Sequence, residues 1–435
     1  ISLRSLVKGK NQQNIIANYA GQFGAVLIPL ITLPYYLLML GSTNWGLVSL
    51  SVLLQNFMNM FGAGMSQAIV REVALRKGDT LEHRKCVAGL LLGLERLYWL
   101  IGLACAVVLL VLSPWLAQLL IRPTLPEGGS LIITLAGLMF AAQFVATPYK
   151  AILYATEQQV RSNSITLFWL LIRHGSALAV CNLYGSASAY LAVTAFFMVL
   201  ELLSFRSSAW SLLAVNKSQA SVNAEAGIKD IIRLTGPLTL SVVISLLTMQ
   251  VDKWVVAIEL STDTLGIYTI ASTLGLGVLN LFTPIATAYQ PSLIHKVSLG
   301  VSLRPVNIKL AKLFFAYGVV LIVCYLLFGS YVLHKWLRNP EYVESIYSVI
   351  GILLIGSSLN AMYNIGYMNW LARGETHKIL RANCASLLTV AMVVPIATRL
   401  YGMNGAAVGW LLTNFICFIL SLDWLKDTST HAANR

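Results

Sequence analysis

Apolar stretches long enough to cross a lipid bilayer recur along the whole chain and leave few residues between them. A helix needs about 20 mostly apolar residues to span the hydrocarbon. Of the 435 residues, 57% are apolar and 11% are charged, whereas an average soluble domain is about 25% charged. The sequence therefore predicts an all-α, multi-pass integral membrane protein. We expect twelve transmembrane helices, centred near Ala25, Gln55, Gly102, Phe140, Leu171, Thr194, Ser245, Gly277, Val319, Ser357, Met392 and Leu412.

The distribution of basic residues predicts the orientation of these helices. The formal net charge of +13 would by itself fit a nucleic-acid partner, but the charges lie at the ends of the apolar stretches. If the N-terminus is cytoplasmic, 22 of the 30 Lys and Arg fall in cytoplasmic segments and four fall in outside loops. Because cytoplasmic loops are enriched in Lys and Arg, we expect both termini in the cytoplasm and no nucleic-acid partner. The first helix shows no cleavable signal pattern, so we expect it to remain as an anchor.

The sequence offers little that would support catalysis. The longest polar stretch, about residues 206–230, is too short and too poor in apolar residues to form a separate catalytic domain. The six cysteines fall within predicted helices or at their ends, without the paired spacing of disulfides or metal sites, so we expect them to serve in packing. We expect no enzyme activity, no cofactor and no metal site.

Short motifs recur at a nearly constant offset, which indicates an internal duplication. The tripeptide Leu-Tyr-Gly at residues 183–185 returns at 400–402, an offset of 217. Residues 44–50 match 264–270 at an offset of 220. Because an even number of helices separates the copies, both halves would have the same orientation, as in transporters built from parallel repeats. The predicted domains are two six-helix lobes, residues 1–215 and 216–435.

Six of the predicted helices carry polar stripes, and two of these stripes are related by the repeat. Gln143, Thr147 and Lys150 recur at spacings of four and three residues, which places them on one face of a helix. A polar stripe within the membrane must face other protein or a water-filled cavity, so the stripe is either an interhelical contact or a cavity wall. The stripe returns 217 residues later without the lysine, as Asn360, Asn364 and Tyr367.

Basic residues within predicted spans are further candidates. An ionisable side chain there costs about 2.5 to 3.5 kcal/mol on insertion scales unless it is paired or faces water, so it is a functional candidate by default. Arg173 lies about ten residues, or roughly 15 Å of helix, before the outside turn at 183–185. It would face the substrate or form a structural ion pair. Arg96 and its neighbour Glu95 point about 100° apart around the helix, so they cannot both face the same partner. Arg96 would therefore line the cavity or snorkel to the surface.

Two acidic residues complete the set. Asp252 ends a face of hydroxyl residues and is a candidate proton or cation site, since a buried carboxylate is relieved by protonation or by a bound cation. The alternative is an ion pair with Arg96 or Lys150. We expect Lys253 to be the neighbour of Asp252 in sequence and not its facing partner. Glu201 lies close to Arg206 near a cytoplasmic end, and we expect it to be a boundary residue.

Three local motifs carry a resemblance to a known family. The segments are Leu40-Gly41 followed by Trp45-Gly46-Leu47, Asp252 followed by residues 265–268 (Leu-Gly-Ile-Tyr) and Ala271, and the turn at residues 401–407. The chain resembles the polysaccharide transporter family of the multidrug/oligosaccharidyl-lipid/polysaccharide (MOP) exporter superfamily, and within it the Wzx-type O-antigen flippases. One departure is the turn at residues 185–189, which lacks the second glycine seen at Gly405.

The resemblance implies a MATE-like fold and a flippase in the bacterial inner membrane. Its substrate would be an undecaprenyl-diphosphate-linked oligosaccharide, carried in a polar, cationic cavity between the two lobes. Lys150 and Arg173 would receive the diphosphate, with Arg96 as a further cation. The sugars would contact Gln143, Thr147, Asn360, Asn364 and Tyr367. Asp252 would couple transport to a proton or a sodium ion.

Other partners and functions remain open at this point. Candidate partners besides membrane lipid are a polysaccharide polymerase and a chain-length regulator. The alternatives in the same superfamily are a flippase for another lipid-linked glycan and a MATE-like drug/cation antiporter, which would favour an acidic, aromatic-lined cavity that Lys150 and Arg173 argue against. A membrane glycosyltransferase or polymerase would need a sizeable catalytic segment outside the membrane. A structural scaffold would leave the polar stripes unexplained.

Overall fold

The computed structural model describes residues 3–75, 80–121, 128–215, 243–279, 282, 293, 296–297 and 299–425. Side chains are described from Gly21 onward, apart from Gln22 and most of residues 59–79. The contacts between Cα atoms divide the chain into two compact units, Ile1–Val243 and Ile244–Arg435.

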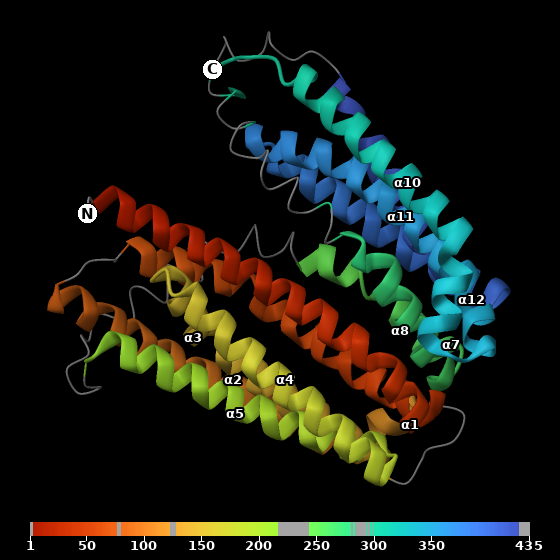
Figure 1. Cartoon of the computed structure of the whole chain (residues 1–435), viewed down its shortest axis with the longest axis horizontal. Helices are drawn as coiled ribbons and strands as arrows, with labels where there is room; N and C mark the ends of the chain where they lie inside the picture. The colour runs from red at the N-terminus through yellow and green to blue at the C-terminus, as the bar shows by residue number, and fades with distance from the viewer. Residues whose placement is uncertain are drawn as a thin grey trace. The chain divides into compact units, whose positions relative to one another are not determined.

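The described part of unit 1 (Ile1–Val243) contains five long helices that run side by side in Figure 1. They are α1 (Leu3–Leu75), α2 (Leu81–Leu120), α3 (Gly129–Ala155), α4 (Gln159–Tyr184) and α5 (Ala187–Leu213). Unit 2 (Ile244–Arg435) contains α7 (Val251–Glu259), α8 (Thr262–Gly277), α10 (Arg304–Leu337), α11 (Pro340–Arg373), α12 (Thr376–Leu420) and the short 3₁₀ helix η2 (Leu422–Leu425).

The prediction of an all-helical, multi-span membrane protein is confirmed. Within the described residues, eight helices are long and apolar enough to cross a membrane. Two of the longest are interrupted, α1 at Gly41 (φ 73°, ψ 176°) and α12 at Gly402 (φ 58°, ψ −138°), so each joins two helical segments. All twelve predicted centres lie in helical residues. The number twelve, the two six-helix lobes, the boundary at residue 215 and the internal repeat remain predictions.

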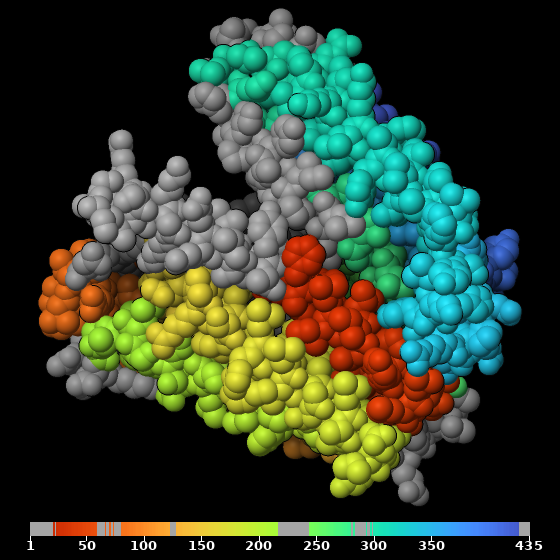
Figure 2. Space-filling view, in the orientation of Figure 1, coloured from red at the N-terminus to blue at the C-terminus, as the bar shows by residue number. Residues whose placement is uncertain are grey.

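One helix forms the core of unit 1. Helix α3 packs against α1, α2 and α5, and 67% of its most apolar window is buried, against 17% for α4. Aromatic residues join it to α2, with the rings of Tyr98 and Phe144 stacked at 4.6 Å. The surface of unit 1 visible in Figure 2 is formed largely by α1, α4 and α5. From Met139 to Ala155, the residues of α3 that are not buried are those of its polar stripe and Tyr154.

Unit 2 is organised in the same manner around α11, which packs against α8, α10 and α12. Its core contains a reciprocal pair of amides. Asn307 of α10 and Asn369 of α11 are both fully buried, and each donates from Nδ2 to the other's Oδ1 at 3.0 Å. A buried amide without partners would be costly. This pair therefore fixes how α10 and α11 dock.

The interruption of α12 at Gly402 brings the two segments of that helix into close contact. A Cβ added at Gly405 would overlap the backbone carbonyl of Ala397. Because backbone atoms cannot turn aside as a flexible side chain can, the helix itself would have to shift. Gly405 is therefore required for this turn, whereas a Cβ added at Gly175 in α4 would meet no atom within 4 Å.

We predict that Gly405→Ala lowers the free energy of unfolding by about 2 kcal/mol or more, as forced overpacking typically does. Gly175→Ala is the matched control, since both glycines lie in helices. It should be neutral, or stabilising by about 0.5 to 1 kcal/mol through helix propensity. Thermal unfolding of both purified variants in the same detergent checks this. Equal melting temperatures would contradict the assigned close contact.

Candidate functional site

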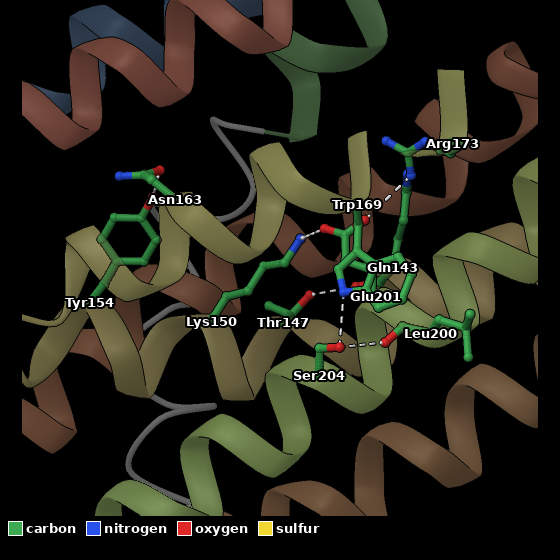
Figure 3. A network of polar contacts seen from close by, with 10 residues as sticks. All are labelled: Gln143, Thr147, Lys150, Tyr154, Asn163, Trp169, Arg173, Leu200, Glu201 and Ser204. Atoms are coloured by element: carbon green, nitrogen blue, oxygen red, sulfur yellow. Dashed lines mark hydrogen bonds and ion pairs between the residues drawn. The ribbon is translucent and has the colours of Figure 1, made fainter. Parts of the chain in front are cut away.

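Three charged side chains from three helices meet inside unit 1. Lys150 of α3 places Nζ 3.2 Å from Oε1 of Glu201, and Arg173 of α4 places Nη1 3.3 Å from Oε2 of the same residue. Glu201 lies near the middle of α5. Figure 3 shows the two cations reaching the carboxylate from different helices. We call Lys150, Arg173 and Glu201 the charged triad; it carries one net positive charge.

The triad differs in exposure from one member to the next. The side chains of Glu201, Arg173 and Lys150 are 10%, 14% and 35% exposed, respectively. The Lys150 ammonium also lies 4.6 Å from the centre of the Phe205 ring on α5, which is within the range of a cation–π contact. The carboxylate is thus the most enclosed member, and Lys150 is the cation most open to a ligand.

Polar contacts between α4 and α5 hold the triad in place. Trp169 lies one turn before Arg173 and donates from Nε1 to the Ser204 hydroxyl at 2.9 Å. Eight residues before Trp169 on α4, Arg161 donates to the Ser211 hydroxyl at 2.9 Å. These two bonds and the Arg173–Glu201 pair form three rungs between the helices, and Figure 3 draws two of them.

The predicted stripe on α3 is the partly open face of that helix. Gln143, Thr147 and Lys150 are all half-buried, whereas nearly all their neighbours on α3 are buried. Thr147 donates its hydroxyl to the Gln143 carbonyl at 3.4 Å, and one turn beyond Lys150 the Tyr154 hydroxyl donates to Asn163 of α4 at 3.5 Å. The stripe is shown with the triad in Figure 3.

The position of Glu201 corrects the expectation of a boundary residue near Arg206. Arg206 instead donates from Nε to Oε1 of Glu95 on α2 at 2.7 Å, and Trp210 donates to the other oxygen of Glu95 at 3.0 Å. Helix packing, which a linear sequence does not reveal, decides which acid meets which base. The clue that could have identified Glu201 is the rule already applied to Arg173, that a charge within an apolar span is a functional candidate.

Arg96 lies apart from the triad. It is exposed on α2, while the adjacent Glu95 is buried. The two therefore point in different directions, as their helical spacing predicts. Among the described residues, no hydrogen bond or ion pair joins Arg96 to the triad, and its predicted role in binding substrate stays a prediction.

The second stripe forms an amide network in unit 2. Asn360 of α11 donates to Oδ1 of Asn414 on α12 at 2.6 Å, and Asn364 donates to Oδ1 of Asn360 at 2.9 Å. Tyr367 follows on the same face, half-buried, with its ring 6.3 Å from that of Tyr363. Like the stripe on α3, these three residues are half-buried.

Asp252 has partners that differ from the sequence expectation. Its carboxylate is buried and lies 3.2 Å from Nζ of Lys253, the neighbour that was not expected to face it, and it accepts a bond from the Tyr268 hydroxyl at 2.7 Å. Asp252 lies in the first turn of α7, just after a turn at residues 249–250. Lys253 curls back over that turn, and its Nζ also bonds the Met249 carbonyl at 3.0 Å. Of the expected hydroxyl face, Ser241 lies outside the described residues.

We predict measurable coupling between Glu95 and Arg206, and little between Glu201 and Arg206. A double-mutant cycle with Glu95→Gln and Arg206→Gln should give an interaction free energy of about 1 kcal/mol, toward the lower part of the usual range because Arg206 is partly screened by solvent. The matched cycle with Glu201→Gln should give less than about 0.5 kcal/mol. Unfolding of the variants in mixed micelles provides the measurement. The reverse order of coupling would contradict the assigned pairs.

Comparison with known proteins identifies the family of this chain. The family described as "Polysaccharide biosynthesis protein" matches residues 12–295. A putative O-antigen transporter of Shigella flexneri is 22% identical over 417 residues, which cover 95% of this chain and 97% of that protein.

Solved structures with the same fold include two groups of proteins. The lipid II flippase MurJ in an inward closed conformation has a TM-score of 0.72 at 15% identity, with 94% of this chain and 86% of that chain covered. An inward-facing MATE multidrug transporter of the MOP superfamily has a TM-score of 0.68 at 13% identity, with 94% and 97% covered. The chain therefore belongs to the polysaccharide biosynthesis protein family, and its fold is the one seen in MurJ and in the MATE transporter.

Proposed function

We propose that this protein is a flippase that moves an undecaprenyl-diphosphate-linked oligosaccharide, such as an O-antigen repeat unit, across the bacterial inner membrane by alternating access. The observation that carries the proposal is the charged triad, with two cations and one carboxylate inside a helical bundle. The name of the Shigella relative, an O-antigen transporter, and that of MurJ, a lipid II flippase, both point to lipid-linked glycans. We also propose that both termini lie in the cytoplasm.

The triad suits a diphosphate because it offers positive charge with free donors. Lys has three N–H donors and Arg has five, and each uses one on Glu201. Charge-assisted hydrogen bonds to an anion contribute about 1.5 to 3 kcal/mol each, and a planar guanidinium can donate two parallel hydrogen bonds to two oxygens of one phosphate. Lys150 and Arg173 can therefore bind the headgroup of the lipid carrier.

The two polar stripes suit the sugar portion of such a substrate. Gln143 and Thr147 on α3 and Asn360, Asn364 and Tyr367 on α11 are all half-buried. Amides and hydroxyls exchange hydrogen bonds with sugar hydroxyls without demanding a particular charge. We assign these residues to the oligosaccharide, with Arg96 as a further cation at the surface of unit 1.

The MATE structures raise the alternative of a drug/cation antiporter. A site for organic cations needs acidic and aromatic groups, and the triad has a net positive charge that would repel such a substrate. The charge therefore favours an anionic substrate. A flippase for a different lipid-linked glycan would share the same cation site and would differ only along the stripes.

We predict that the Lys150→Ala, Arg173→Ala double variant loses most transport without losing its fold. Lys150→Arg should be better tolerated than Lys150→Ala, because it keeps the charge, and Arg173→Ala should be worse than His174→Ala. The measurement is surface O-polysaccharide restored in a flippase-null strain at matched protein level.

The matched control is Arg84→Ala, which removes an exposed cation of α2 outside the triad. It should restore polysaccharide nearly to the wild-type level. Full restoration by the double variant would refute the assignment of these cations to the substrate. If the wild-type protein restores export of a different lipid-linked glycan and not of O-antigen, the cation site stands and the proposed substrate is wrong.

We also propose that Asp252 couples transport to a proton or a sodium ion. A buried carboxylate held by one ammonium and one hydroxyl can exchange these partners for an ion during the transport cycle. Asp252→Asn should then alter the dependence of transport on pH or sodium. Glu341→Gln, an exposed acid on α11, is the control and should leave it unchanged. If Asp252→Asn preserves the ion dependence, Asp252 is a structural ion-pair residue only.

A further inference from the structure

We propose that Glu201 is a resident counter-anion, which competes with the substrate diphosphate for Lys150 and Arg173 and thereby sets how readily the substrate is released. This inference rests on the proposed function, in which those two cations bind the diphosphate. It assigns a positioning and affinity-setting role to a residue that the sequence placed at the membrane boundary.

The first support is the way in which the carboxylate divides its two oxygens. Oε1 contacts Lys150 and Oε2 contacts Arg173, so one acid from α5 holds cations from α3 and α4 at the same point. Within the described part of the chain, Glu201 is the acid that pairs with each of them. Without it, two like charges would lie side by side in the bundle. Glu201 therefore assembles the cation site in the absence of substrate.

The second support is the exposure of the three side chains. Glu201 is enclosed, whereas about a third of Lys150 is open, and most donors of both cations have no hydrogen-bond partner among the described residues. A phosphate can therefore contact the cations first while the carboxylate is still in place. Glu201 can then give up one or both contacts as phosphate oxygens replace its own.

The third support is the charge balance. The triad carries one net positive charge, and a diphosphate bridging a lipid and a sugar carries about two negative charges, so the occupied site keeps one excess negative charge. Removing the charge of Glu201 would balance the occupied site. At an effective dielectric constant of about 20, a unit charge about 5 Å away changes an equilibrium constant by about two powers of ten. Partial exposure reduces this, so we expect about tenfold or more.

A site that binds too tightly is a poor transport site. Conduction and transport need binding that is favourable enough for entry and weak enough for exit. The carboxylate of Glu201 weakens the bound state and re-pairs the cations once the diphosphate departs. The expected signature of its loss is tighter binding together with slower transport, a combination that a simple loss of structure does not produce.

The test uses Glu201→Gln in the full-length protein, purified in lipid nanodiscs, with radiolabelled farnesyl diphosphate as the probe. Glutamine keeps the shape and one acceptor oxygen and loses the charge. We expect its dissociation constant to fall about tenfold or more, while surface polysaccharide in the flippase-null strain decreases at matched protein level. Glu95→Gln, which removes another buried, paired carboxylate from unit 1, should not tighten binding.

Each result separates this inference from the proposed function. If wild type binds the probe, the Lys150→Ala, Arg173→Ala variant does not, and Glu201→Gln binds no tighter, then the counter-anion role is wrong and the cation site stands. If the double variant binds as well as wild type, the cation site itself is wrong. Equal tightening by Glu95→Gln would also overturn the inference, because the tighter binding would then follow from the net charge of unit 1 and not from the contact of Glu201 with the two cations.

A second variant covers poor folding of Glu201→Gln. Glu201→Ala leaves room for a small carboxylate, so added acetate should weaken probe binding in this variant at least several-fold more than in wild type. Chloride at the same ionic strength is the control, because it tests simple screening. Equal effects of acetate on both proteins would overturn the counter-anion role.

Discussion

The contact between one carboxylate and two cations is what allows three charges to lie within the bundle of unit 1. A helix in lipid satisfies its own backbone but offers nothing to a charged side chain. Glu201 provides that partner and draws α3, α4 and α5 to one point. The same requirement explains another ion pair in unit 1, in which Glu95 meets Arg206 between α2 and α5. The same ion pairs therefore join the helices and neutralise the charges between them.

Around its central helix α11, unit 2 pairs buried polar groups through neutral amides. Asn307 and Asn369 satisfy each other inside the core, and Asn360 bonds Asn414 at the partly open face of α11. An amide carries both a donor and an acceptor, so two amides can pair without any excess charge. The polar face of α3 carries a positive charge and that of α11 carries amides, which distinguishes the two units despite their similar arrangement around a central helix.

Helix content and the polar stripes could be predicted because both depend on periodicity within one segment. Lys150 and Arg173 stood out since a charge in an apolar run is rare. Their shared partner could not be predicted, because Glu201 lies 51 and 28 residues away along the chain and only packing brings it close. The expected partners of Asp252 were wrong for a local reason. Asp252 opens a helix just after a turn, where the long side chain of Lys253 can bend back toward it.

The three rungs between α4 and α5 have a consequence for how the site can change. Successive rungs are separated by eight and four residues on α4 and by seven and three residues on α5, running in opposite directions. Such matched spacing pins the register of a helical hairpin, so α5 cannot slide along α4 without breaking every rung. Arg173 can part from Glu201 by a rotamer change alone, whereas helix sliding is a collective motion that takes microseconds or longer. The hairpin of α4 and α5 is thus rigid, whereas the Arg173 side chain on it can change its conformation.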